Sequence, residues 1–298
     1  MIYYNILDYS NGIVTFSIPN GVFDPEKSFD CGQCFMWYRL HSVSGTFKGV
    51  VGSKLLYLKY VSKSDDFDTF QLTEHPNYLP SFLEYLGLND DYTPLLNSVL
   101  SDYEKHIVLV GKGIRILHQD PWETIISFII SQRNSIPKIK KSIDNLCTNL
   151  GSKKSKRFEL INSNEDYYIF PTPKVILDDN YTKLNQCSLG YRAEYIYLAA
   201  KEYVENPQFF KSLLNKSRSS DEIISDLCTL KGIGPKVSNC IALFGYNRLD
   251  VFPIDVWIQR ILNKQYPNGI DISKYNSLSG LLQQYMFYAE RYSSYGIL

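Results

Sequence analysis

Hydrophobic and polar residues alternate along the first part of the chain, in short runs such as GIVTFSI at 12–18 and LLYLKYV at 55–61. Gly, Ser, Asn and Asp separate these runs, and alternation with a period of two between turn-forming residues is typical of β-strands. We therefore expect residues 1–118 to form a β-rich domain built on an antiparallel sheet.

The pattern becomes helical after residue 118. In QDPWETIISFIISQ at 119–132, Asp120 is placed to cap a helix and Pro121 occupies its first position. Glu123 completes a capping box ahead of an apolar run. These signals predict a helix that starts at Pro121.

Further helices follow in the same part of the chain. From 136 to 150, Ile and Leu recur at steps of three and four, and Gly151 is placed to end this helix. Three more helices are expected at 189–204, at 219–230 with Ser220 as N-cap, and at 279–292. Strands first and helices second is the order of an α+β protein. We therefore expect residues 119–298 to form a mainly helical domain.

The composition is that of an ordinary globular chain, with 298 residues, 44% hydrophobic and 21% charged, and a net charge of zero. This charge gives no global attraction to nucleic acid or to an acidic membrane. A polyanionic partner would have to bind locally, at two basic runs. These are Lys138, Lys140 and Lys141, then Lys153, Lys154, Lys156 and Arg157. Runs of this kind are more often solvated surface than a binding footprint.

The six cysteines are scattered, and only Cys31 and Cys34 have the C-x-x-C spacing of metal ligands. A tetrahedral site needs a second pair, which the sequence does not offer nearby, so we expect no metal. The opening MIYYNILDYS is not a basic-then-apolar leader, and no run is long enough to span a bilayer. We expect a cytoplasmic protein of a prokaryotic, intracellular type with reduced thiols.

The segment LKGIGPKVSNCIALFGY at 230–246 has the features of a helix-hairpin-helix. Leu230 closes one helix, Gly232 and Gly234 permit a tight turn with positive φ, and Pro235 fits the first turn of the next helix. Such a hairpin exposes backbone N–H groups at the positive end of a helix to a phosphate. A G-x-G sequence between two helices also occurs as a simple connector.

Lys236 and Asp255 are the candidate catalytic pair. A lysine in the first helical turn lies at the positive end of the helix dipole, where a positive charge is disfavoured. With partial burial, this placement should shift Lys236 toward the neutral amine, which can attack an electrophilic carbon. Asp255, in FPIDVWIQRIL, precedes an apolar helix and is a natural N-cap. Capping alone explains it about as well as a second role, as proton acceptor or as stabiliser of positive charge on a sugar ring.

LKGIGPKVSNC and the aspartate nineteen positions after its lysine together resemble the helix-hairpin-helix Gly-Pro-Asp signature of the DNA glycosylase superfamily. The lysine marks the bifunctional branch, in which the amine attacks C1′ of the deoxyribose and the Schiff base permits strand cleavage by β-elimination. The resemblance implies a DNA glycosylase and AP lyase with Lys236 as nucleophile and Asp255 assisting. The four cysteines that hold the iron–sulfur cluster of endonuclease III relatives do not follow the hairpin here. We expect no cofactor.

Within the superfamily, the chain most resembles the 8-oxoguanine DNA glycosylases. Cys240 matches the cysteine that stacks on one face of the extruded base. In GLLQQYMFY, Gln283 matches the glutamine that binds the base edge, and Phe287 the phenylalanine on the other face. In FDCGQCFMW, Gly32 matches the glycine whose carbonyl accepts the N7–H that guanine lacks, a contact that rejects guanine. From the residues alone, Cys240 and Phe287 would be assigned to the core.

The segment LGYRAEY resembles the part of the family that supplies a tyrosine wedge and an arginine reading the orphaned cytosine, here Tyr191 and Arg192. An aromatic wedge offsets part of the few kcal/mol that base flipping costs. Arg133 and Asn134 stand in the run that eukaryotic members fill with asparagines. Lys138 replaces a second cytosine-reading arginine and cannot make the same bidentate contact. We therefore expect a looser preference for cytosine opposite the lesion.

The DNA backbone is expected to bind at the N–H groups around Gly232 and Gly234. Trp257 stands where the family has a phosphate-contacting histidine. The implied partner is double-stranded DNA containing 8-oxoguanine. We expect a monomer with the lesion pocket between its two domains, and no membrane partner.

Two alternatives remain open. One is a helix-hairpin-helix glycosylase for another oxidised or alkylated base. The other is a non-catalytic helix-hairpin-helix DNA-binding module, which would need neither Lys236 nor Asp255.

Overall fold

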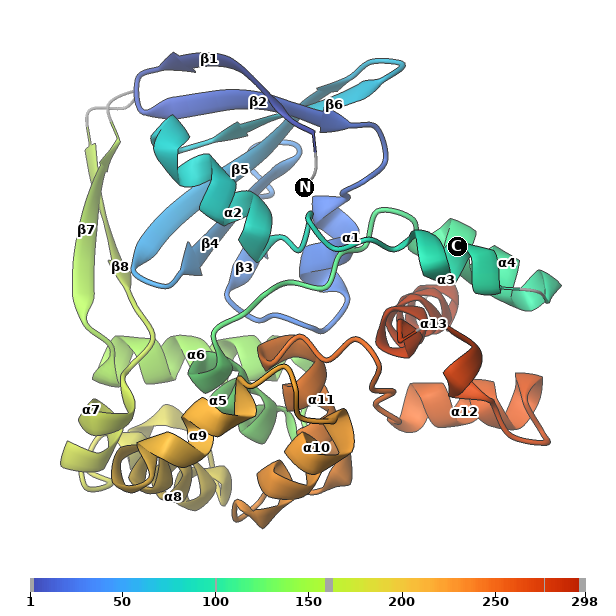
Figure 1. Cartoon of the computed structure of the whole chain (residues 1–298). Coiled ribbons are helices and arrows are strands. Elements are labelled where there is room, and N and C mark those ends of the chain that lie inside the picture. The colour runs from blue at the N-terminus through green and yellow to red at the C-terminus, as the bar shows by residue number, and fades with distance from the viewer. Residues whose placement is uncertain (1–2, 100, 159–162, 276, 295–298) are drawn as a thin grey trace.

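An antiparallel sheet of six strands forms the N-terminal part of the chain, in the order β1-β2-β6-β5-β4-β3 (Figure 1). The computed structural model describes residues 3–99, 101–158, 163–275 and 277–294. The strands are β1 (Asn5–Ser10), β2 (Ile13–Pro19), β3 (Trp37–Arg39), β4 (Thr46–Val51), β5 (Lys54–Lys63) and β6 (Phe67–Leu72). Each neighbouring pair runs antiparallel, so the predicted N-terminal sheet is confirmed.

Alternation along the strands sets the buried face of this sheet. In β2, Val14, Phe16 and Ile18 are at most 1% exposed, as the period of two in GIVTFSI predicts. Helices α1 (Pro25–Asp30) and α2 (Leu79–Tyr85) contribute apolar side chains to the same core. The sheet is therefore closed on one face by two short helices.

The turn after α1 is anchored at both of its ends by this core. Phe29 of α1 stacks on Trp37 of β3 with the ring centroids 4.2 Å apart. Gly32 lies between these two aromatic residues in the chain. Its position relative to the sheet is therefore fixed by a rigid aromatic pair.

The segment after β6 is helical, so the expectation of strand and turn structure up to residue 118 is wrong beyond Leu72. It contains η1 (Pro76–Tyr78), α2, α3 (Thr93–Ser98) and α4 (Asp102–Gly111). Ser101 caps α4 and forms a capping box with Glu104, a start signal that the sequence carries as S-x-x-E. Helix α4 packs against the C-terminal helix α13 (Ser279–Ser294) and so connects the N-terminal part to the last helix.

Helices make up most of the C-terminal part and pack around α5 (Pro121–Ser131), whose Ile125, Ile126, Ile129 and Ile130 are 0% exposed. The others are α6 (Ile136–Leu150), α7 (Pro173–Asp178), η3 (Leu184–Cys187), α8 (Arg192–Glu205), α9 (Pro207–Leu213), α10 (Ser220–Thr229), α11 (Pro235–Gly245), α12 (Val256–Gln265), η4 (Ile272–Tyr275) and α13. The predicted α+β order, sheet first and helical body second, is confirmed.

Two of the predicted caps differ from the observed ones. Ser219 caps α10 and forms a capping box with Glu222, so Ser220 is the first helical residue and not the cap. Asp120 caps α5 as predicted, but the Glu123 carboxylate does not return the bond to Asp120 within the described part of the chain. Burial and the nearby charge of Asp120 raise the pKa of Glu123 to about 8.

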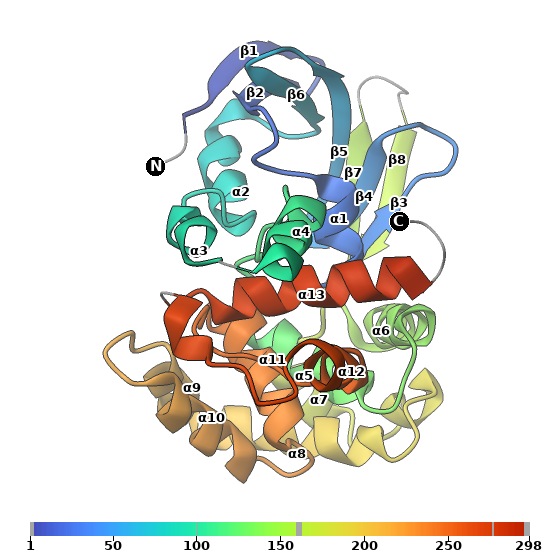
Figure 2. The same ribbon diagram turned by 90° about the vertical axis from the view of Figure 1, so that its right-hand side faces the viewer.

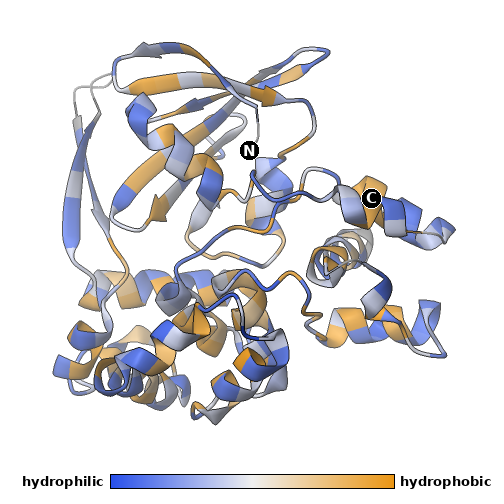
Figure 3. Cartoon of the chain, viewed as in Figure 1, coloured by the Kyte–Doolittle hydropathy of each residue, from blue (hydrophilic) through white to orange (hydrophobic). Residues whose placement is uncertain are grey.

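A β-hairpin that the sequence analysis missed joins the helical body to the sheet. Strands β7 (Lys153–Phe158) and β8 (Ser163–Tyr168) pair with each other and rise along one side of the sheet (Figure 1). Colouring by hydropathy shows the hairpin as mostly hydrophilic (Figure 3), because its strands are rich in charged residues and lack the apolar face that marks a strand in the sequence.

Several of the hairpin's polar side chains bind the N-terminal sheet. Lys156 Nζ donates to the carbonyls of Leu55 and Thr73 at 2.8 and 2.5 Å. On α6, Lys140 Nζ donates to the Trp37 carbonyl at 2.6 Å. These two lysines of the basic runs therefore bridge the two parts of the protein.

Helix α13 lies across the middle of the molecule, between the N-terminal elements and the helical body (Figure 2). It packs against α4 on one side and α12 on the other. Among the described residues, no helix is both long and apolar enough to cross a membrane.

Candidate active site

The helix-hairpin-helix forms where it was predicted. Helix α10 ends at Thr229, and α11 begins at Pro235 with Gly234 as its N-cap. Only Gly232 has a positive φ, at 86°, whereas Gly234 has a φ of −97°. A Cβ on Gly232 would lie 2.3 Å from the Tyr195 ring, whereas one on Gly234 would meet nothing within 4 Å. Gly232 is therefore required by the turn, and Gly234 leaves the N-terminus of α11 open to a ligand.

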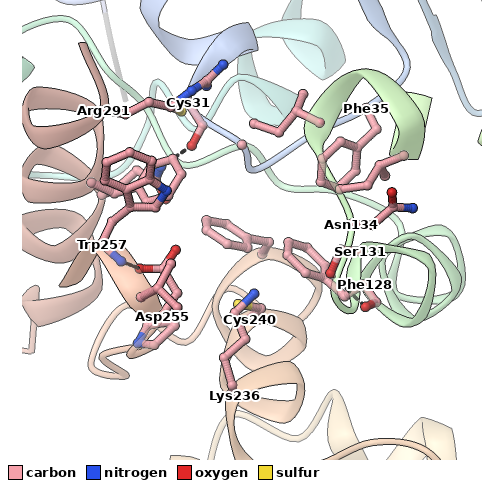
Figure 4. A pocket seen from close by; sticks show the side chains of 18 of the residues that line it. Cys31, Phe35, Phe128, Ser131, Asn134, Lys236, Cys240, Asp255, Trp257 and Arg291 are labelled. Atoms are coloured by element: carbon pink, nitrogen blue, oxygen red, sulfur yellow. Dashed lines mark hydrogen bonds between the residues drawn. The ribbon is translucent and has the colours of Figure 1, made fainter. Parts of the chain in front are cut away.

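A pocket of about 370 Å³ lies where the N-terminal turn meets helices α5, α6, α11, α12 and α13 (Figure 4). This volume lies within the range of small-molecule sites. Eight of the predicted site residues line it: Gly32, Asn134, Lys236, Cys240, Asp255, Trp257, Gln283 and Phe287. Six do not: Arg133, Lys138, Tyr191, Arg192, Gly232 and Gly234.

Lys236 and Cys240 point into the pocket from successive turns of α11 (Figure 4). Lys236 Nζ lies 5.7 Å from the centroid of the Phe128 ring. Burial raises the pKa of the Cys240 thiol, although the charge and hydrogen bond of Lys236 oppose this shift. Cys240 is therefore a neutral, apolar surface beside the amine.

Lys236 itself is exposed, contrary to the partial burial expected from the sequence. Lys236 lies in the first turn of α11, and its side chain lines the pocket from there.

Asp255 caps α12 as predicted, with one oxygen. Its Oδ1 accepts from the backbone N–H groups of Trp257 and Ile258, both at 2.9 Å. Its Oδ2 has no hydrogen-bond partner in the described part of the chain. Capping and a catalytic role are therefore compatible, because the cap leaves one oxygen available toward the pocket that Asp255 lines.

Gly32, Gln283 and Phe287 form what we call the recognition wall. Gly32 has a φ of 79°, and a Cβ there would lie 3.3 Å from Cε1 of Phe287, so the two residues are close neighbours in the pocket lining. Gln283 is 5% exposed, and its Oε1 has no partner among the described residues. A buried, unpaired acceptor costs roughly 1–3 kcal/mol, which is recovered when a ligand donates to it.

A second group of residues, which we call the rim network, lies beside the pocket. Tyr191 is half exposed, and the Arg192 guanidinium lies 4.7 Å from its ring centroid. Arg192 donates to the backbone carbonyls of Gln132 and Arg133, and Arg133 has a φ of 47°. Gln132 Nε2 donates to the Gly232 carbonyl at 2.9 Å. The rim network is therefore tied to the hairpin.

The remaining predicted residues are Asn134, Trp257 and Lys138. Asn134 lines the pocket and donates to the Ile130 carbonyl at 3.2 Å. Trp257 also lines the pocket, with the Arg260 guanidinium 4.9 Å from its ring centroid. Lys138 is exposed on the first turn of α6.

Cys31, Phe128, Gln284 and Arg291 also line the pocket, but the sequence analysis did not predict them as site residues. Gln284 and Arg291 lie on α13 seven positions apart, which is two helical turns and therefore one face. This spacing is the sequence signal that could have identified Gln284 and Arg291 as neighbours. Phe128 is one of several apolar residues of a buried helix, and nothing in its spacing marks it.

The cysteine pair of the N-terminal turn is buried, and among the described residues it belongs to no group of three or more His, Cys, Asp or Glu that could hold a metal ion. Burial raises the pKa of Cys31 to about 12 and also raises that of Cys34. Metal ligation requires thiolates, and burial disfavours that form of both thiols.

Comparisons with known proteins decide the family. A profile of the 8-oxoguanine DNA glycosylase N-terminal domain matches residues 15–125, and one of the HhH-GPD superfamily of base excision DNA repair proteins matches residues 126–275. The chain belongs to the 8-oxoguanine DNA glycosylase family. The predicted membership of the helix-hairpin-helix Gly-Pro-Asp superfamily is thereby confirmed.

Individual relatives of the chain belong to the same family. An N-glycosylase/DNA lyase of Saccharomyces cerevisiae is 29% identical over 264 residues, covering 79% of this chain and 66% of the yeast protein, just under two thirds of it. A solved structure of MBOgg1 with a low-affinity DNA ligand is 31% identical, with a TM-score of 0.85, and the match covers 98% of this chain and 100% of that one. The Clostridium acetobutylicum 8-oxoguanine glycosylase/lyase, solved with DNA containing cytosine opposite 8-oxoguanine, is 28% identical with a TM-score of 0.81, covering 99% and 98%.

Proposed function

We propose that this protein is a bifunctional DNA repair glycosylase and AP lyase that excises 8-oxoguanine from double-stranded DNA. The observation that carries the proposal is one pocket lined by a lysine, a carboxylate and a buried, unpaired amide oxygen, namely those of Lys236, Asp255 and Gln283. A DNA-binding module without catalysis would need none of these three groups. The yeast and clostridial relatives named as glycosylase/lyases support the same reaction.

Binding begins at the DNA backbone. The open N-terminus of α11 around Gly234, and the turn at Gly232, offer backbone N–H groups to a phosphate. The half-exposed Tyr191 fills the gap left by the extruded nucleotide, and Arg192 reads the orphaned base. Arg133, Asn134, Lys138 and Trp257 add contacts around the pocket.

The extruded base enters the pocket and is held on three sides. Cys240 and Phe287 stack on its two faces, and Gln283 binds its Watson–Crick edge. The Gly32 carbonyl accepts the N7–H of 8-oxoguanine. Guanine has no hydrogen at N7, so it would leave this carbonyl unpaired and be rejected.

The chemistry then uses the amine and the carboxylate. The neutral form of Lys236 forms an Nζ–C1′ bond as the C1′–N9 bond breaks, and the base leaves with the electron pair and takes up a proton. Asp255 stabilises the positive charge on the sugar through the oxygen that the helix cap does not use. The amine on C1′ then loses a proton, and the C1′–O4′ bond breaks as O4′ takes up a proton, which gives the Schiff base. C2′ loses a proton and the C3′–O bond breaks, so that the 3′ phosphate leaves with the electron pair.

We also propose that residues 1–118 and 119–298 act as two domains with the lesion pocket between them. The pocket takes Cys31, Gly32 and Phe35 from the first range and its other lining residues from the second. The protein works as a monomer without a cofactor, in the reducing interior of the cell. Its six cysteines are unpaired, which fits that compartment.

A panel of damaged duplexes tests the substrate. Base release would be measured with excess protein on duplexes carrying 8-oxoguanine, an oxidised pyrimidine or an alkylated purine, each opposite cytosine and each of the other bases. We expect release of 8-oxoguanine to be fastest, with cytosine only modestly preferred opposite it. Faster release of another lesion would support the alternative glycosylase, and no release from any duplex would support the non-catalytic module.

A further inference from the structure

Helix α13 makes two sets of contacts around the pocket. Gln283 and Phe287 line the recognition wall, whereas Gln284 and Arg291 reach the turn that precedes Gly32. Figure 2 shows α13 lying between this N-terminal region and the helical body, and Figure 4 shows Arg291 and Cys31 close together at one edge of the pocket.

Two consecutive backbone carbonyls before Gly32 are held by α13. Gln284 Nε2 donates to the Cys31 carbonyl. Arg291 donates through one guanidinium nitrogen to the Asp30 carbonyl at 2.6 Å, and a second nitrogen lies 3.9 Å from the Asp30 carboxylate. The Tyr292 hydroxyl donates to the same carboxylate. The peptide planes on the N-terminal side of Gly32 are thus fixed from one helix.

The residue that follows Gly32 is held from the other side. Gln33 is 1% exposed, and its amide nitrogen donates to the carbonyls of Ser28 and Arg115 at 2.8 and 2.7 Å. The Gln33 carbonyl accepts from Gln119 at 2.8 Å. Gly32 therefore lies between two neighbours that hydrogen bonds hold in place.

The hydrogen bonds to the neighbours of Gly32 matter because glycine places little restriction on its own backbone angles. Glycine populates positive and negative φ about equally, so the residue does not fix its own carbonyl direction. A hydrogen bond weakens steeply when its angle falls away from linear. A small rotation at Gly32 would therefore cost the N7–H contact, while the stacking on Cys240 and Phe287 would be unaffected.

We propose that Gln284 and Arg291 are positioning residues that fix the direction of the Gly32 carbonyl and thereby set discrimination between 8-oxoguanine and guanine. Neither residue needs to touch the base. Gln283 and Phe287 lie on the same helix as these two residues. One rigid helix would therefore position the Gly32 carbonyl, the contact of Gln283 with the base edge and the stacking of Phe287 on one face of the base. The inference rests on the proposed function, since it assigns a device to that substrate preference.

The test measures equilibrium binding in a Lys236→Gln background, which removes turnover. Fluorescence anisotropy would give Kd for duplexes carrying 8-oxoguanine, guanine or 8-bromoguanine, which is substituted at C8 but has no N7–H. The variants are Gln284→Met, Arg291→Met and Arg291→Lys. Gln208→Met, an exposed residue of α9 outside the pocket lining, is the matched control.

We expect Gln284→Met to lower the preference for 8-oxoguanine over guanine and over 8-bromoguanine by about 10-fold, as for one weakened hydrogen bond. Binding to the two duplexes without N7–H should stay unchanged. Arg291→Met should act in the same direction, and Arg291→Lys should restore most of the preference because lysine can still donate to the Asp30 carbonyl. Gln208→Met should match the parent.

Three results would overturn the inference. One is an unchanged preference in every variant, and another is an equal loss of affinity for all three duplexes, which a merely structural role would produce. If the parent itself showed no preference for 8-oxoguanine, the proposed function would fail and the positioning role with it. If Gln284→Met does not fold, Arg291→Met and its Arg291→Lys rescue decide the outcome.

Discussion

The recognition wall and the rim network differ in how their polar groups are satisfied in the free protein. In the recognition wall, Gln283 Oε1 is buried without a partner in the described residues, while the neighbouring turn is braced by Gln284 and Arg291. In the rim network, Arg192 already donates to the carbonyls of Gln132 and Leu189. The recognition wall has an unpaired acceptor before any ligand binds, whereas Arg192 would have to give up internal hydrogen bonds to bind DNA as we propose.

This difference indicates where specificity is generated. A preorganised pocket loses little free energy in rearrangement, so its contacts translate directly into discrimination among bases. An arginine that gives up hydrogen bonds to backbone carbonyls gains only the difference between two sets of bonds. We therefore expect the protein to discriminate the lesion more strongly than the base opposite it.

The largest effect short of removing the nucleophile is expected at Asp255. Asp255→Asn keeps an oxygen for the helix cap, so the free energy of unfolding should change by less than about 1 kcal/mol. It removes the negative charge next to the sugar, so the single-turnover excision rate should fall by about 100-fold or more, with little change in the Kd for lesion DNA. An effect confined to thermal stability would favour a capping-only role.

A substitution at Gln283 is expected to change DNA binding and folding stability in opposite directions. Gln283→Met removes the buried, unpaired oxygen, so the free energy of unfolding should rise by about 1 kcal/mol. The same change should weaken binding of 8-oxoguanine DNA by about 10-fold. Denaturant unfolding and anisotropy on the same samples would measure both quantities. A loss of stability together with unchanged affinity would contradict our assignment of this oxygen to the base edge.

How far the site could be predicted from the sequence is seen at neighbouring positions of α13. Gln283 and Phe287 were identified through a family segment, whereas Gln284 was passed over although it is adjacent. A helix turns each residue by about 100°, so adjacent glutamines face different neighbours. Which neighbour Gln284 meets depends on the turn after α1, more than 250 positions earlier in the chain, and no local pattern contains that information.

The fold prediction succeeded where a local apolar pattern marks an element and failed where distant polar contacts hold it. Strand β2 and helix α6 were predicted because each buries one apolar face at its own period. The β7–β8 hairpin was missed because it is held by polar bonds to the sheet, such as those of Lys156. Asp255 was recognised as a cap, but that it caps with one oxygen depends on the geometry of α12.

A smaller effect is expected in the opposite-base preference. Lys138 is exposed at the start of α6, and Lys138→Arg would supply the planar donor pair that lysine lacks. We expect the preference for cytosine over adenine opposite the lesion to rise several-fold, within the roughly 1–3 kcal/mol of a good bidentate contact. Excision rates on duplexes with each opposing base would measure it. An unchanged or reduced preference would remove Lys138 from this role.

A pH dependence of stability is expected at Glu123, which does not line the pocket. Its pKa is raised from the ordinary 4.5 to about 8 by burial, so the folded protein binds this proton more tightly than the unfolded chain. The stabilisation is complete below pH 4.5 and is lost as the pH rises toward 8. Glu123→Gln should therefore become progressively more stable than wild type over this range in denaturant unfolding. A stability difference that does not vary with pH would contradict the assignment.

The central claim is that Lys236 is the nucleophile, and borohydride trapping tests it most directly. Wild type, Lys236→Gln and the control Lys231→Gln, a hairpin lysine paired with Glu194 at 3.4 Å, would be mixed with duplexes carrying 8-oxoguanine or guanine opposite cytosine. We predict a covalent adduct with the lesion duplex for wild type and Lys231→Gln, and none for Lys236→Gln, which should still bind the lesion. An adduct with Lys236→Gln, or excision by wild type without any adduct, would contradict the account.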